Sequence, residues 1–162
     1  LRGHPLGMTD LSIFLPDPQA TDALAATLAA RLTPGDTVLL AGDLGAGKSH
    51  LSRRIIQSLQ RPFGRVDDVP SPTYTLIQTY RAGEVEILHA DLYRLGDPSE
   101  LVELGLDEAI GSAICLIEWP DRLDTTPDNA LHIQLLPEGG GRRAKLYGSG
   151  WPARLEGLVV DA

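Results

Sequence analysis

The chain has 162 residues, of which 43% are hydrophobic and 22% are charged. This length and composition are typical of one globular domain with a sizeable core, and they argue against extensive disorder. The formal net charge of -8 argues against a protein that grips DNA or RNA by itself, because an acidic surface repels the nucleic-acid backbone. Any role with RNA would need a partner that supplies basic surface.

Residues 1–7 read LRGHPLG and precede Met8, so we interpret them as an expression remnant and expect a single domain over residues 8–162. No apolar run approaches about eighteen residues, and no signal-peptide segment opens the chain, so we expect a cytoplasmic protein without a membrane contact. Cys115 is the only cysteine, which excludes an internal disulfide and a cysteine-rich zinc site.

The first predicted elements are a helix, a strand and a second helix. Asp17 is a suitable N-cap and Pro18 a suitable first residue for a helix over about 18–32. The short apolar run at 37–42 ends in glycine and predicts a buried strand. A glycine-rich loop follows, and apolar residues at helical spacing then predict a helix over 48–60.

The middle of the chain is predicted to contain three strands. Residues 61–75 include three prolines and are expected to form a loop. The segments 76–81 and 85–94 are expected to be strands around a short turn, and the apolar run at 113–119 is expected to be a buried strand that ends at an acid.

A further helix is predicted over 97–110, where Asp97 and Glu100 form a capping-box pattern. Two strands around a run of three glycines predict a hairpin at about 130–150, and the closing segment 151–160 reads either as a helix or as a strand. Together, these elements predict a three-layer α/β fold with a mostly parallel central sheet and an antiparallel edge hairpin.

The loop at 42–49, GDLGAGKS, matches the pattern G-x-x-x-x-G-K-[ST] of P-loop NTPases. Its backbone N–H groups and the following helix N-terminus would attract phosphate, Lys48 would reach the outer phosphates, and the Ser49 hydroxyl would bind Mg²⁺. An ordinary strand–turn–helix corner is the alternative. The expected nucleotide-binding residues are Asp43, Leu44, Gly45, Ala46, Gly47, Lys48, Ser49 and His50.

A magnesium–nucleotide site also needs carboxylates near the ion. Asp91 and Glu118 each end an apolar strand, and parallel strands deliver such ends to one edge of the sheet. Thr73 and Thr75 lie in a segment that could order around Mg²⁺ or a γ-phosphate, or could be a proline turn entering a strand. The expected metal ligands are Ser49, Asp91 and Glu118, and the expected catalytic residues are Lys48, Thr75, Asp91 and Glu118.

Four segments in this order resemble the TsaE family, also called YjeE-like. They are GDLGAGKSHLSR (42–53), SPTYTLIQTY (71–80), HADLYRLGDPSELVELGLDE (89–108) and CLIEWPDRL (115–123), and the resemblance runs from about residue 14 to residue 146. Members are small P-loop ATPases required for bacterial threonylcarbamoyladenosine formation on tRNA. The resemblance therefore implies a P-loop NTPase-type fold, with ATP and Mg²⁺ as cofactors.

The resemblance also implies partners and roles. The implied partners are TsaB and TsaD, and TsaD is the partner that carries the transferase site. The assembly as a whole would hold the tRNA. Lys48 falls on the phosphate lysine, Asp91 on the metal-side aspartate and Glu118 on the magnesium-binding glutamate, while Ser71–Thr75 falls on a switch-like threonine segment. In-line attack by water would be positioned by Asp91 or Glu118, and the residues do not separate these two roles. Trp119 either packs or faces a partner.

The sequence departs from the family pattern after the lysine, where two threonines are usual and Ser49 and His50 stand here. Serine keeps the magnesium hydroxyl. The imidazole of His50 could donate a hydrogen bond to phosphate, which predicts a nucleotide affinity that depends on pH in the range where imidazole titrates. Equal nucleotide Kd values at about pH 5.5 and pH 8 would contradict this hypothesis.

Several alternatives stay open on the residues alone. A small-metabolite kinase of the shikimate kinase type also opens with a glycine loop, but the triple glycine at 139–141 comes late and inside a hairpin pattern. A nucleotide-gated binding module that barely turns over is another possibility. His89 is either a satisfied core residue or a proton-transfer group. Arg142 and the helix start near Pro18 are candidates for an adenine pocket.

Overall fold

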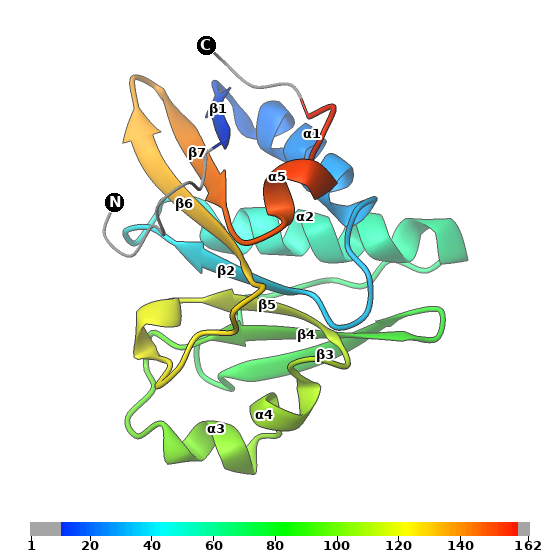
Figure 1. Ribbon diagram of the computed structural model, residues 1–162, viewed down its shortest axis with the longest axis vertical. Helices are drawn as coiled ribbons and strands as arrows, with labels where there is room; N and C mark the ends of the chain where they lie inside the picture. The colour runs from blue at the N-terminus through cyan, green and yellow to red at the C-terminus, as the bar shows by residue number, and fades with distance from the viewer. Residues whose placement is uncertain (1–10, 159–162) are drawn as a thin grey trace.

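The computed structural model describes residues 11–158, so the expected remnant at 1–7 and the last residues of the expected closing segment lie outside the described range. Within that range, seven strands form one sheet in the order β1-β7-β6-β2-β5-β4-β3 (Figure 1). The strands are β1 Leu11–Leu15, β2 Thr37–Ala41, β3 Ile77–Ala82, β4 Val85–Asp91, β5 Ile114–Glu118, β6 Leu131–Glu138 and β7 Gly141–Tyr147.

The centre of the sheet is parallel and both of its sides are antiparallel. Neighbouring strands among β6, β2, β5 and β4 run parallel. The β6–β7 hairpin continues antiparallel into β1 on one side, and β3 pairs antiparallel with β4 on the other. This confirms the α/β fold with a mostly parallel sheet and an antiparallel edge hairpin, and it adds a second antiparallel edge.

Helices cover both faces of the sheet, which makes three layers (Figure 1). α1, α2 and α5 lie on one face, and the short α3 and α4 lie on the other. Alternate residues of one strand enter different cores: Val38 and Leu40 of β2 pack on the α1/α2 side, whereas Leu39 packs on the α3/α4 side. The helices are α1 Pro18–Ala29, α2 Lys48–Gln60, α3 Ser99–Glu103, α4 Leu106–Ala109 and α5 Trp151–Arg154, with 3-10 turns at Arg61–Phe63 and Pro120–Arg122.

The first two helices begin where the sequence predicts. Asp17 is the N-cap of α1, and its Oδ1 accepts a hydrogen bond of 2.9 Å from the backbone N–H of Ala20. α1 ends at Ala29, earlier than expected. α2 begins at Lys48 and ends at Gln60, as the helical spacing predicts, and its apolar side packs against the sheet.

The predicted single helix over 97–110 is wrong in its continuity. Gly105 has φ of 86°, a left-handed conformation that ends α3 and begins α4. The capping pattern is present, because Glu100 Oε1 accepts a hydrogen bond of 3.1 Å from the Asp97 N–H. The closing segment starts with the short helix α5. No helix among residues 11–158 is long and apolar enough to cross a membrane.

Candidate functional site

The glycine loop connects the end of β2 to the start of α2, and its lysine points back onto the loop. Lys48 is 5% exposed, and its Nζ donates hydrogen bonds to the carbonyl oxygens of Gly42 at 2.6 Å and Asp43 at 2.9 Å. The same Nζ lies 4.2 Å from the centre of the Trp119 ring. Burial lowers the pKa of Lys48 below its ordinary value, and nearby carboxylates oppose this shift.

The two carboxylates predicted at strand ends lie side by side. β4 and β5 are parallel, and their register places Asp91 opposite Glu118. Glu118 is 1% exposed, and its Oε1 accepts a hydrogen bond of 2.9 Å from the Ser49 hydroxyl. Its other oxygen, Oε2, lies 2.6 Å from Nε2 of the buried His89. One carboxylate thus joins α2, β4 and β5.

The threonine segment contacts the second carboxylate through Ser71 and Thr73. Their hydroxyls donate to Asp91 Oδ2 at 3.1 and 3.2 Å, and the Tyr93 N–H donates to Oδ1 at 3.1 Å. Thr75 is not brought to this cluster, because its side chain is exposed and its hydroxyl accepts from the Gln78 amide at 3.1 Å. Of the two candidate threonines, Thr73 is therefore the one at the site.

These groups surround a cavity of about 290 Å³ at the carboxyl end of the central strands. The oxygen atoms available as metal ligands belong to a serine hydroxyl and two carboxylates, and they suit a hard cation such as Mg²⁺. Among residues 11–158, no group of three or more His, Cys, Asp or Glu side chains could hold a metal by itself. This donor set fits Mg²⁺, which is commonly bound by one or two carboxylates together with waters and substrate phosphates. The lining residues are Leu44, Gly45, Gly47, Lys48, Ser49, His50, Ser71, Thr73, Asp91, Glu118 and Trp119.

The remaining loop residues take different positions. The side chains of Asp43 and Leu44 are exposed, and Leu44 lies at the cavity with 67% of its surface open. His50 pairs with α1, because its Nε2 lies 2.9 Å from Oδ1 of Asp22. The same oxygen is 3.2 Å from Nε of Arg54. The imidazole that the sequence places next to phosphate therefore already has a carboxylate partner.

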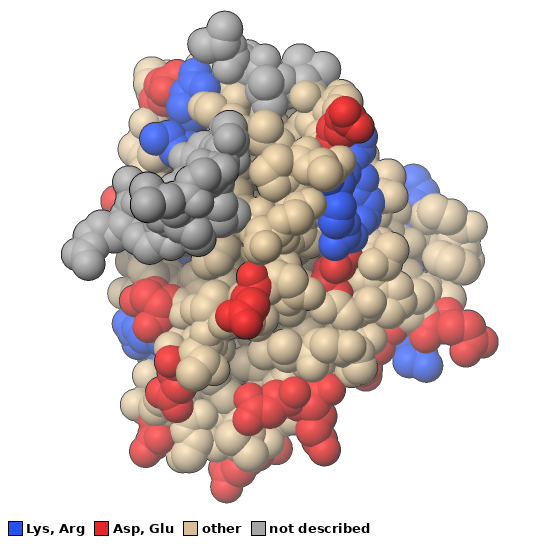
Figure 2. Space-filling view, in the orientation of Figure 1, with Lys and Arg blue, Asp and Glu red and all other residues tan. Residues whose placement is uncertain are grey.

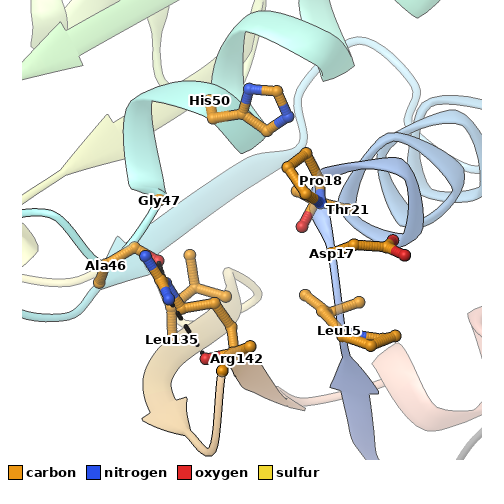
Figure 3. Close-up of a pocket in the computed structure, with 12 residues that line it drawn as sticks. Leu15, Asp17, Pro18, Thr21, Ala46, Gly47, His50, Leu135 and Arg142 are labelled. Atoms are coloured by element: carbon orange, nitrogen blue, oxygen red, sulfur yellow. Dashed lines mark hydrogen bonds between the residues drawn. The ribbon is translucent and has the colours of Figure 1, made fainter.

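A second cavity of about 370 Å³ adjoins the loop on its other side (Figure 3). It lies between the start of α1, the glycine loop and the β6–β7 turn, so the structure brings together Pro18 and Arg142, the two adenine-pocket candidates. The wall is largely apolar, with Leu15 and Leu135 among its residues, which suits the face of a base. Ala46, Gly47 and His50 belong to this wall as well.

Arg142 has a structural role that the sequence did not reveal. Its Nε donates to the carbonyl oxygen of Ala46 at 2.8 Å, and its Nη2 donates to that of Gly45 at 2.9 Å (Figure 3 labels Ala46 and Arg142). The planar guanidinium therefore holds two consecutive loop carbonyls at once. The contact joins positions almost a hundred residues apart, and no local pattern announces it.

The acidic surface of the molecule is uneven. Figure 2 shows acidic side chains gathered over the lower part of the face turned toward the viewer, where Figure 1 places α3 and α4. The exposed acidic residues of these two helices include Glu100 in α3 and Asp107 and Glu108 in α4. Basic side chains are more frequent on the opposite part of the same view.

Comparisons with known proteins agree on one family. Residues 15–144 match the family described as threonylcarbamoyl adenosine biosynthesis protein TsaE. The chain is 41% identical over 129 residues to the tRNA threonylcarbamoyladenosine biosynthesis protein TsaE of Rickettsia felis, covering 78% of this chain and 74% of that protein. It is 38% identical over 129 residues to the protein of the same name from Bacillus subtilis, covering 78% of each.

A solved structure supports the same assignment at the level of the fold. The crystal structure of Bacillus subtilis YdiB superposes with a TM-score of 0.70 at 29% sequence identity, covering 93% of this chain and 91% of that one. The matched range of the family contains the glycine loop, both strand-end carboxylates and Arg142. The chain belongs to the TsaE family of threonylcarbamoyl adenosine biosynthesis proteins.

Proposed function

We propose that this chain is a magnesium-dependent ATPase that supports repeated threonylcarbamoylation of adenosine in tRNA by a complex of the TsaB and TsaD proteins. Family membership supports the pathway. The observation that carries the ATPase is the convergence of a glycine loop, a buried lysine and two strand-end carboxylates on one cavity. This is the arrangement that phosphate and Mg²⁺ need together.

The residues divide the work by chemistry. The loop amides and the N-terminus of α2 would bind the phosphates, and Lys48 would exchange its backbone carbonyl partners for phosphate oxygens. Ser49, Glu118 and Asp91 would hold Mg²⁺, which supplies charge neutralisation on the phosphoryl oxygens. Asp91 or Glu118 would also orient the attacking water. The second cavity, beside Arg142 and Pro18, would accept the adenine.

The charge of the chain is consistent with an accessory role. A net charge of -8 gives little affinity for a nucleic-acid backbone, so the partner proteins would hold the tRNA. We place this activity in the cytoplasm, where tRNA is modified. ATP hydrolysis would then change the conformation or assembly of the protein complex, and this chain would not itself act on the tRNA.

A reconstitution tests the proposal. TsaB, TsaD, the threonylcarbamoyl-adenylate donor and substrate tRNA are mixed with the wild-type chain, with Lys48→Ala or with Lys145→Ala as the matched control in β7. We expect several modified tRNA molecules per complex with wild type and with Lys145→Ala, and a single round or less with Lys48→Ala. Equal yields with and without the chain would contradict the proposed role, and a phosphorylated metabolite in a scan of acceptors would replace it with a kinase.

A further inference from the structure

We propose that His89 is a positioning residue that holds the carboxylate of Glu118 in the orientation required for Mg²⁺. The inference rests on the proposed function, because it concerns the magnesium site of that activity. His89 and Glu118 are each 1% exposed, and His89 Nε2 lies 2.6 Å from Glu118 Oε2.

The sheet places the two side chains on one face. Ile87 packs in the core under α1 and α2, and residues at alternate positions of a strand share a face, so His89 and Asp91 lie on the same side. Glu118 stands opposite Asp91 in the β4–β5 register, which makes His89 its diagonal neighbour. The imidazole thus approaches Glu118 from the neighbouring strand β4, while the Ser49 hydroxyl approaches from the start of α2.

The direction of the hydrogen bond follows from the role that the proposed function gives to Glu118. Ser49 donates its hydroxyl proton to Oε1, so Glu118 acts as an acceptor at that oxygen. A carboxyl group that binds Mg²⁺ is ionised and has no proton to give, so on the proposed function Nε2 of His89 carries the N–H that donates to Oε2. In this tautomer Nδ1 is a bare acceptor, and within residues 11–158 it is buried without a hydrogen-bond partner.

This arrangement restrains the carboxylate at both oxygens. With Oε2 held by the imidazole, rotation of the side chain would break this hydrogen bond, and Oε1 stays directed toward the Ser49 hydroxyl at the cavity. Groups behind a metal ligand commonly fix its orientation in this way, and their loss weakens metal binding. The unsatisfied Nδ1 is consistent with a ring placed for its one contact with Glu118.

A purely structural role for His89 predicts something different. If the imidazole only satisfies a buried carboxylate, then its replacement lowers stability but leaves the magnesium dependence of nucleotide binding unchanged. The two roles separate when metal dependence and stability are measured on the same variants.

The test compares His89→Gln with His89→Asn. The glutamine amide nitrogen stands near the place of Nε2 and keeps a donor for Glu118, whereas the asparagine nitrogen stands near the place of Nδ1 and does not reach it. ATP binding is measured by calorimetry over a series of Mg²⁺ concentrations and in EDTA. We expect His89→Asn to raise the half-maximal Mg²⁺ concentration by about 10- to 100-fold and His89→Gln to stay within about threefold of wild type.

The inference also predicts equal ATP affinity for all three proteins in EDTA, because the loop amides and Lys48 are untouched. Equal Mg²⁺ requirements in His89→Asn and wild type would overturn it, as would a parallel loss of affinity in EDTA. Thermal unfolding of both variants checks that they are folded. If wild type itself binds ATP without any dependence on Mg²⁺, then the proposed function fails, and that result is visible before either variant is examined.

Discussion

At position 48, a buried ammonium group is held by backbone oxygens. Its two carbonyl partners, Gly42 and Asp43, belong to the loop that would bind phosphate. The Trp119 ring adds a contact on another side. Burial lowers the pKa of Lys48, which means that the charged ammonium is less stable in the folded protein than in water. An anion bound beside the ammonium would stabilise its charged form.

Replacing this lysine separates binding from stability. We expect Lys48→Met to weaken MgATP binding by about 10- to 100-fold, the loss of one charge-assisted hydrogen bond worth about 1.5–3 kcal/mol. The melting temperature should change little, because the methylene stem is kept and the removal of a buried charge offsets the loss of the hydrogen bonds to Gly42 and Asp43. Calorimetry and thermal unfolding measure the two quantities, with Lys145→Met as the control. Unaltered MgATP binding would contradict the assignment of the loop.

At the residue scale, local sequence patterns predicted four of the residues that the structure brings together at the cavity. Lys48 and Ser49 follow from the loop pattern, and Asp91 and Glu118 follow from the ends of apolar strands. Thr75 does not join them. The backbone of this segment bends at Leu76, which has φ of 67° and whose N–H bonds to Pro72, and this turn directs Thr73 to Asp91 instead. The residue types in this segment do not predict a tight turn of this kind.

At the scale of elements, the β6–β7 hairpin supports the glycine loop from outside. Arg142 lies at the start of β7 and donates to two loop carbonyls, while Arg143, its neighbour, forms a surface ion pair with Glu138. Successive residues of a strand point to opposite faces, which explains the different partners. The hairpin thus contributes to the shape of a loop that it does not adjoin in sequence.

This contact predicts a binding defect from outside the loop. We expect Arg142→Ala to weaken MgATP binding by about tenfold, because the loop loses its two guanidinium contacts, and Arg142→Lys to recover part of the affinity, since a lysine reaches only one carbonyl well. Arg143→Ala is the matched control and should bind as wild type. Equal losses in the two alanine variants, measured by calorimetry, would show that the hairpin as a whole is damaged and that the loop contact is not the cause.

Elements were predictable where their signals are local. α2 follows from a glycine loop and a clear apolar spacing, and both of its ends agree with the prediction. β1 was not predicted, because it is short and its pairing partner β7 lies far along the chain. The helix expected over 97–110 was predicted as one piece because Gly105 is tolerated in a helical pattern, whereas the fold uses it for a left-handed bend.

At the scale of the whole molecule, the sheet separates two cores, and the central strands β2, β4 and β5 each contribute side chains to both. Cys115 belongs to the core under α3 and α4, although its strand neighbours Ile114 and Leu116 pack on the opposite side. The thiol is fully buried. Burial raises the pKa of Cys115 to about 12, since a thiolate would be desolvated there.

The thiol therefore predicts a stability that depends on alkaline pH. The folded pKa lies above the unfolded value, so the unfolded state loses its proton first, and this contribution to stability falls as pH rises from the ordinary thiol pKa of 9.0 toward about 12. Denaturant titrations at pH 8 and pH 10.5 measure it. Cys115→Ala should lower stability at pH 8 through the lost packing but should show a smaller loss between the two pH values. An identical loss in both proteins would contradict the assignment.

One oxygen of Asp91 would be shared between two hydrogen bonds and a bound cation. Oδ2 already accepts from the hydroxyls of Ser71 and Thr73, so a cation that takes this oxygen as a ligand must compete with both. The free energy of ion binding is then less favourable by the free-energy cost of breaking these two hydrogen bonds. On the proposed function, this competition favours release of the ion after each round, because the hydroxyls of Ser71 and Thr73 can donate to the carboxylate again once the ion has left.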